Sequence, residues 1–159
     1  MDHNRRHLAR SGGTRVISYL LDTNVLIPLL WPLHREQEKV RKWFFAHAAK
    51  SFATCSFTQA GFLRITTSLE IMRQRYALSD ARALLLALTQ QPGHTFWHTS
   101  IDFFEATAPF ERRMHGPKQI TDAYLLGIAK HHGGRLATLD KAVNSLAGPE
   151  FGDVVELIE

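Results

Sequence analysis

Short runs of consecutive apolar residues alternate along this chain with segments in which apolar residues recur every three or four positions. Runs rich in β-branched and aromatic residues are typical of strands that are buried on both faces. They predict strands at 16–21, 51–55, 95–97, 135–138 and 154–158. The helical spacing predicts a short helix from 25, helices at 36–49, 57–69, 79–88, 103–114 and 122–132, and a last short helix opened by Asp140.

Helix boundaries are marked by a few residues with strong local preferences. Thr121 is expected to cap the helix at 122–132, and the pair Gly133-Gly134 is expected to end it. Pro109 has no backbone N–H to donate, so it should bend or divide the helix at 103–114.

The alternation of strands and helices indicates the α/β class, with a mainly parallel central sheet that is flanked by helices and joined by right-handed crossovers. The 159 residues suit one domain with its own core. Residues 1–15 are polar and basic and contain a Ser-Gly-Gly segment, which predicts a flexible basic arm. We therefore expect the folded domain to span 16–159.

Composition and charge narrow the class of protein only slightly. Hydrophobic residues make up 45% of the chain and charged residues 21%, which is ordinary for a globular protein. The net charge of +4 is a mild excess that fits a polyanionic partner but also fits simple solubility. Cys55 is the single cysteine, so no intramolecular disulfide can form. The apolar segment 16–31 carries Asp22 and Asn24 and is shorter than the roughly 20 residues of a membrane helix. We expect a cytoplasmic protein.

Three aspartates occupy the positions at which α/β proteins carry their functional groups. Asp22 directly follows the first predicted strand, and Asp140 follows the strand at 135–138 by one residue. Asp122 is predicted in the first turn of a helix. Because ligands of open α/β sheets bind beyond the carboxyl ends of the strands, these residues are expected to converge in one pocket.

Carboxylates that converge repel one another, and a hard divalent cation relieves the repulsion. Mg²⁺ or Mn²⁺ in such a site lowers the pKa of a bound water and stabilises charge on a phosphate, which suits phosphodiester hydrolysis. Each aspartate alone could instead cap a helix or complement its dipole. The combination favours a site, because Asp22 follows a run in which five of six residues are apolar.

Four segments of the chain together resemble the motifs of one nuclease family. They are 20–26 (LLDTNVL), 53–64 (ATCSFTQAGFLR), 120–125 (ITDAYL) and 136–142 (LATLDKA). In this order and spacing they resemble PIN-domain nucleases, and most closely the VapC-type toxins of bacterial toxin–antitoxin pairs. The resemblance covers roughly residues 16–158.

The resemblance implies a three-layer PIN fold and a Mg²⁺- or Mn²⁺-dependent endoribonuclease that is the toxin of a type II toxin–antitoxin pair. It implies cellular RNA as substrate, a cognate small antitoxin as partner, and a homodimer or a toxin–antitoxin hetero-oligomer. Carried over by position, Asp22, Asp122 and Asp140 are the metal-binding and catalytic acids. Thr23, Asn24 and Thr138 fall where the family has polar residues that support the site.

Gln59 departs from the family pattern, because the wider family usually has Glu at the position we align with it. The amide oxygen of Gln59 can accept a hydrogen bond from a metal-bound water, but it supplies no charge. Metal affinity should therefore fall. Gln59 is retained as a candidate catalytic residue, with a plain surface-helix role as the alternative.

Three basic residues are candidates for RNA binding, and two other functions are alternatives. Arg112, Arg113 and Lys118 flank the turn before Asp122 and could bind RNA phosphates or simply be solvated. The first alternative function is a PIN-like RNA- or protein-binding module with weak or absent catalysis. The second is a phosphatase-like hydrolase with an Asp nucleophile, which would need Asp-x-Asp after the first strand, whereas this chain has Asp22-Thr23-Asn24.

Overall fold

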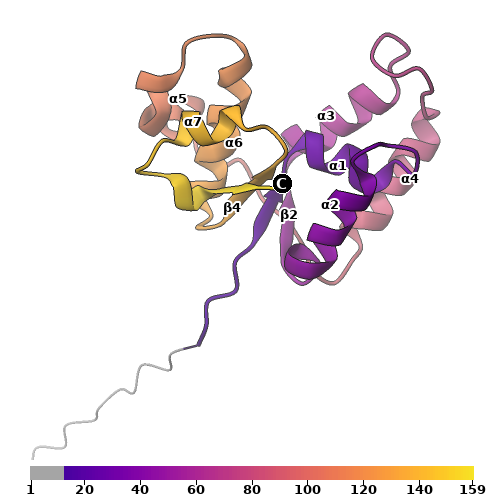
Figure 1. The fold of residues 1–159 in the computed structure, drawn as a ribbon, viewed down its shortest axis with the longest axis horizontal. Helices are drawn as coiled ribbons and strands as arrows, with labels where there is room; N and C mark the ends of the chain where they lie inside the picture. The colour runs from indigo at the N-terminus through magenta and orange to yellow at the C-terminus, as the bar shows by residue number, and fades with distance from the viewer. Residues whose placement is uncertain (1–12) are drawn as a thin grey trace, which may run out of the picture.

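A five-stranded, all-parallel sheet forms the centre of the computed structural model, which describes residues 13–159 (Figure 1). Its order is β3-β2-β1-β4-β5, and every neighbouring pair is parallel. The strands are β1 (Tyr19–Leu21), β2 (Phe52–Thr54), β3 (His94–Phe96), β4 (Arg135–Thr138) and β5 (Val155–Leu157). The predicted parallel sheet is confirmed. Most of the predicted N-terminal arm, residues 1–12, lies outside the described residues.

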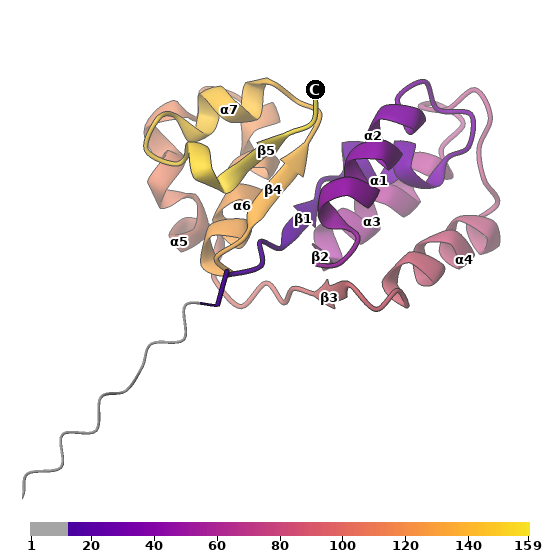
Figure 2. The same ribbon diagram turned by 60° about the horizontal axis from the view of Figure 1, so that its bottom comes forward.

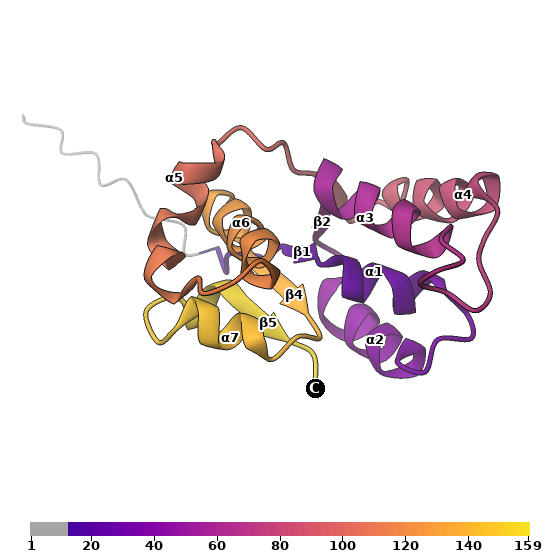
Figure 3. The same ribbon diagram turned by 90° about the horizontal axis from the view of Figure 1, so that it is seen from above.

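Seven α-helices join the strands within residues 13–159. They are α1 (Thr23–Leu30), α2 (Gln37–Trp43), α3 (Ser56–Thr66), α4 (Leu78–Thr89), α5 (Phe103–Thr107), α6 (Lys118–His131) and α7 (Ala142–Ala147). Helices α1–α4 gather on one side of the molecule and α5–α7 on the other, as Figures 2 and 3 make clear.

Successive residues of β1 enter different cores, because side chains alternate across a strand. Leu21 packs in a cluster with residues of α1, α2, α3 and α4, such as Phe62. Leu20 packs with residues of α6 and α7, such as Leu126 and Leu146. The continuous apolar run before Asp22 therefore reflects burial on both faces, and it gives the three-layer α/β arrangement.

One helix boundary agrees with the sequence predictions and another differs from them. Pro109 divides the predicted helix at 103–114 as expected: α5 ends at Thr107, and a 3₁₀ segment follows at Ala108–Arg113. Helix α6, however, begins at Lys118, so the prediction that Thr121 caps it was wrong. The Gln119 side chain accepts hydrogen bonds from the backbone N–H groups of His115 and Gly116, which fixes the chain entering the helix. Asp122 consequently lies in the second turn.

The central position of β1 brings its carboxyl end beside that of β4. Leu21 is paired with Ala137, and the Asp22 backbone N–H continues the ladder by donating to the Ala137 carbonyl over 3.0 Å. Asp22 and Thr138 therefore meet at the same edge of the sheet. Within residues 13–159 no helix is both long and apolar enough to cross a membrane.

Candidate functional site

The hydroxyl of Thr138, at the end of β4, joins three of the predicted site residues into one hydrogen-bonded group. Thr138 is fully buried, and its Oγ1 donates to Asp22 Oδ2 over 2.8 Å. It accepts from Asn24 Nδ2 and from the Asp140 backbone N–H, each over 3.1 Å. Asn24 Oδ1 also accepts from the Leu139 backbone N–H. All the hydrogen-bonding capacity of this hydroxyl is thus used inside the site.

Asp22 is the N-cap residue of α1, and its carboxylate is buried. Its carbonyl oxygen accepts from Val25 and Leu26 at the start of α1, but its side chain makes no cap hydrogen bond. Burial raises the pKa of the Asp22 carboxyl, the Thr138 hydroxyl and the backbone N–H groups of Thr23 and Asn24 lower it, and the charge of Asp140 raises it. The Asp22 side chain therefore interacts with Thr138 as well as with the start of α1.

Asp122 approaches the same edge from α6. Burial raises the pKa of its carboxyl to about 6, and the charges of Asp22 and Asp140 add to the rise. Since these effects act between neighbouring charges, the three predicted aspartates lie close enough to repel one another. Asp122 lies beyond the first turn of α6, where the backbone N–H groups are already bonded within the helix. Its side chain is therefore not placed to pair with the free N–H groups at the start of α6.

Asp140 is the exposed member of the group. Its Oδ1 accepts from the Ala142 backbone N–H over 2.9 Å, at the start of α7. Asp140 thus caps the start of α7 and also lies near Asp22. The structure therefore gives the three acids different surroundings: buried, partly buried and exposed.

A divalent cation fits the chemistry of this group. The carboxylates supply hard oxygen ligands, and their mutual repulsion is the conflict that a cation removes. Within the described residues, no three His, Cys, Asp or Glu side chains are already gathered tightly enough to hold an ion together. The arrangement suits an ion such as Mg²⁺, which takes one or two carboxylates directly and reaches others through water.

Helix α3 faces the site through a glycine, which the sequence reasoning missed. A Cβ built on Gly61 would lie 2.6 Å from Thr23 Oγ1, so only glycine lets α3 approach the start of α1 so closely. Thr23 directly follows Asp22. The available signal was a glycine inside a predicted helix, which commonly marks a close approach.

Gln59, the candidate aligned with the family Glu, bonds to a residue at the carboxyl end of β2. Its Nε2 donates to Thr54 Oγ1 over 2.9 Å, and Thr54 also bonds to His94 Nε2 over 2.8 Å. Gln59 lines a hollow between α3 and α4, together with Leu63 and other residues. The hydrogen bonds of the described residues do not connect it to the three aspartates.

The three predicted RNA-binding cations lie on two different elements. Lys118 is exposed at the first residue of α6, and Arg112 is exposed in the 3₁₀ segment. The Arg113 guanidinium lies against Gly148, at the end of α7. Lys118 lies at the same end of α6 as Asp122, whereas Arg113 contacts the far end of α7.

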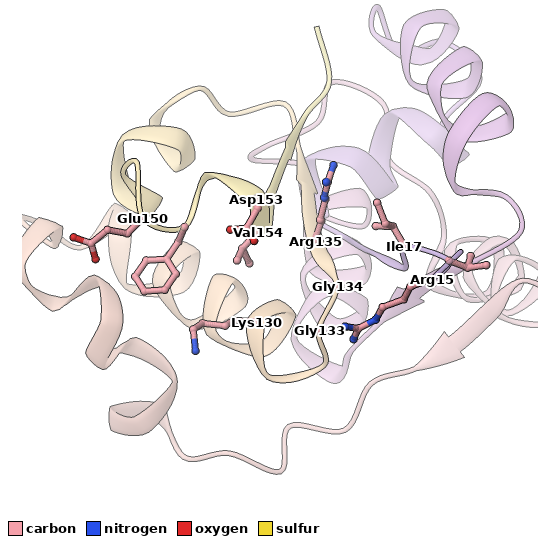
Figure 4. Close-up of a pocket in the computed structure, with 11 residues that line it drawn as sticks. Arg15, Ile17, Lys130, Gly133, Gly134, Arg135, Glu150, Asp153 and Val154 are labelled. Atoms are coloured by element: carbon pink, nitrogen blue, oxygen red, sulfur yellow. The ribbon is translucent and has the colours of Figure 1, made fainter. Parts of the chain in front are cut away.

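A separate cavity of about 490 Å³ lies at the amino ends of the strands, opposite to the aspartates (Figure 4). Residues that precede β1, β4 and β5 line it, including Ile17, Gly134 and Asp153, together with Arg15 and Lys130. None of the predicted site residues contributes to it. The aspartates and this cavity therefore occupy different ends of the strands.

The comparisons with known proteins agree with the fold. The PIN-domain family matches residues 19–149, which is most of the chain. The chain belongs to the PIN-domain family.

Within that family the chain belongs to the VapC group. It is 37% identical to Ribonuclease VapC38 of Mycobacterium tuberculosis over 87% of this chain and 96% of that protein. It is 33% identical to Ribonuclease VapC39 of the same species over 86% of this chain and 98% of that protein.

Two solved structures share the fold at low sequence identity. PAE2754 from Pyrobaculum aerophilum matches with a TM-score of 0.55 at 18% identity, covering 89% of this chain and 86% of that one. FitAcB from Neisseria gonorrhoeae matches with a TM-score of 0.54 at 18% identity, covering 81% and 92%.

Replacing Thr138 with Val should destabilise the protein by about 1–3 kcal/mol, because buried Asp22 and Asn24 lose their partner. Urea denaturation followed by circular dichroism measures the loss. Thr66→Val is the matched control, since the equally buried Thr66 hydroxyl only donates to the Phe62 carbonyl of its own helix. Equal losses in the two variants would contradict the central role of Thr138.

The stability of the metal-free protein should depend on the protonation of Asp122. Its pKa of about 6 in the folded protein lies above the ordinary value of 3.8, so protonation favours the folded state. The Asp122 contribution to the free energy of unfolding should therefore rise as the pH falls from neutral through about 6. Denaturation in a chelator at several pH values measures this, and Asp122→Asn should remove that contribution. Parallel pH profiles for the two proteins would contradict it.

Proposed function

We propose that the protein is a divalent-metal-dependent endoribonuclease, the toxin of a type II toxin–antitoxin pair, and that it cleaves cellular RNA. The observation that carries the proposal is a buried Asp22, held by Thr138 and close to two further carboxylates at the carboxyl edge of the sheet. The 37% identity to a protein named Ribonuclease VapC38 supplies the reaction class.

Asp22 and Asp122 are the proposed direct ligands of Mg²⁺ or Mn²⁺, and Asp140 supports them directly or through water. When bound, the metal supplies an activated water and neutralises charge on the phosphate. Thr138 and Asn24 hold Asp22 and the chain at Leu139 in place, so little rearrangement accompanies substrate binding. The partial burial of Asp122 keeps competing water away from one side of the site.

The proposed partners follow from membership in the VapC group. A cognate small antitoxin would neutralise the enzyme, and cytoplasmic RNA would be its substrate. Among the predicted cations, Lys118 is the best placed to bind a phosphate, because it is exposed at the same end of α6 as Asp122. Arg112 and Arg113 are proposed to contact RNA phosphates farther from Asp122.

Asp22→Asn and Asp122→Asn should each lower RNA cleavage by more than the roughly 10- to 100-fold that loss of an outer-shell group costs at a metal site. The purified variants are assayed with Mg²⁺ or Mn²⁺ and with a chelator, and Mn²⁺ binding is measured separately. Asp153→Asn is the control, because this exposed carboxylate lies in the cavity at the opposite edge. Cleavage that persists in chelator or in Asp22→Asn would refute the proposal.

An alternative function is a PIN-like module that binds RNA or protein with weak or absent catalysis. The neutral Gln59 and the absence of a ready three-ligand group among the described residues favour it. Under this alternative the wild-type protein would bind RNA without cleaving it in any divalent metal.

Gln59→Ala separates a catalytic role from a structural one. If Gln59 acts through its bond to Thr54, the variant should lose about 0.5–1.5 kcal/mol of stability and keep its cleavage rate per folded molecule. Cleavage and denaturation are measured on the same preparation, with Gln91→Ala as an exposed control. A large loss of cleavage at unchanged stability would instead indicate that Gln59 acts in catalysis at the metal site.

A further inference from the structure

A second cavity, of about 360 Å³, lies beside the candidate metal site, between α1 and the start of α2. Asn24 and Leu139 line it, and the Leu139 backbone N–H donates to Asn24 Oδ1 over 3.1 Å. Asn24 follows Asp22 by two residues, and Leu139 directly precedes Asp140. We call this space the α1–α2 cavity. A group bound in it would lie next to the carboxylates.

The α1–α2 cavity has apolar walls. Ile27 and Pro28 of α1 line it together with Leu139. Ile27 and Pro28 are buried, and Leu139 is partly buried, so these walls belong to the folded core and are fixed in place. Sites for small ligands and for ring groups typically combine such walls with a few placed polar groups.

His34 supplies one of the polar groups that line the α1–α2 cavity. Its Nδ1 accepts a hydrogen bond from the Glu36 backbone N–H over 3.1 Å. Burial lowers the pKa of the His34 ring, so the ring is neutral at pH 7 and carries its proton on Nε2. His34 therefore has a hydrogen-bond donor left for a ligand.

Glu36 places a carboxylate between two cations in the same cavity. Its Oε2 lies 2.9 Å from Lys39 Nζ, and its Oε1 lies 3.6 Å from Arg35 Nε. The hydrogen bond from Lys39 lowers the pKa of the Glu36 carboxyl, so the carboxylate is charged. Each carboxylate oxygen can accept more than one hydrogen bond, and Glu36 therefore keeps accepting capacity beside a positive charge.

This mixture of groups fits a nucleobase better than a phosphate. A phosphate would be repelled by Glu36, whose charge also offsets the nearby cations. A base edge carries donors and acceptors side by side, and unpaired RNA bases are read through such edges. Guanine offers N1–H and N2–H as neighbouring donors, which match the two oxygens of a carboxylate. Its O6 and N7 are the acceptors that Lys and Arg commonly bind.

We propose that the α1–α2 cavity binds one unpaired guanine of the RNA substrate, beside the phosphodiester bond that is cleaved. This inference rests on the proposed ribonuclease function. Glu36 accepts from N1–H and N2–H, Lys39 and His34 donate to O6 and N7, and the apolar walls contact the faces of the ring. Glu36 is thus a specificity-determining residue, whereas the aspartates carry the chemistry.

The test is the binding of short single-stranded RNAs that differ at one base: guanine, inosine, 7-deazaguanine or adenine. Fluorescence anisotropy is measured in a chelator, so that the RNA stays intact. Guanine should bind at least about fivefold more tightly than adenine, as a good paired contact to a base edge does. Inosine, which lacks the N2 amino group, should bind about tenfold more weakly than guanine, because a hydrogen bond to a charged group is lost.

Glu36→Gln should abolish the difference between guanine and inosine, and Lys39→Gln should abolish the difference between guanine and 7-deazaguanine. Glu38→Gln is the matched control, because Glu38 is exposed on the same helix and lines a different cavity. It should leave both differences unchanged. Circular dichroism checks that the variants are folded, and the comparison of the four RNAs on the wild-type protein needs no variant.

Equal binding of the four RNAs would overturn the guanine site, and so would a preference that survives Glu36→Gln or is lost equally in Glu38→Gln. Binding that depends on salt but not on the base would identify a phosphate contact instead and would also overturn it. The anisotropy measurement involves no cleavage. A protein that prefers guanine but cleaves no RNA in any divalent metal would therefore refute the ribonuclease function and not the base preference.

Discussion

The hydrogen bond from the Thr138 hydroxyl to the Asp22 carboxylate is the interaction on which the rest of the site depends. It joins the ends of two central strands that are 116 positions apart in the sequence. The same oxygen accepts from Asn24 and from the backbone of Asp140, so it sets the positions of three of the predicted site residues. A buried carboxylate without such a donor would have to leave the interior or take up a proton.

The protein keeps three negative charges near one another at a cost to its own stability. Burial raises the pKa of Asp22 and Asp122, and the neighbouring charges raise both further. Salt bridges to these aspartates would reduce the repulsion between their charges. The salt bridges of the described residues lie elsewhere, as in the pair Arg135–Glu156. A bound cation would relieve repulsion of this kind, which is why the three carboxylates are a candidate metal site.

The sequence predicted the elements whose pattern is set by burial. The parallel strands and the convergence of Asp22 with Asp140 follow from the apolar runs and from the common edge of parallel strands. The start of α6 was predicted wrongly, because the Gln119 side chain accepts hydrogen bonds from the preceding turn and fixes the start of the helix. The sequence had favoured Thr121 as the cap. The direction of Gln59 and the role of Gly61 depend on how α3 packs against its neighbours, which spacing along the chain does not encode. The contact between Arg113 and Gly148 is long-range for the same reason.

The position of β1 at the middle of the sheet also bears on the order in which the molecule can be completed. Asp22, which follows β1, is made early in synthesis, whereas the strand that holds it, β4, follows only after the helices α1–α6 and the strands β2 and β3. Contacts between residues so distant in sequence form late, because the intervening chain must first be ordered. The three aspartates of a growing polypeptide are consequently far apart, and they come together only after β4 has joined the sheet.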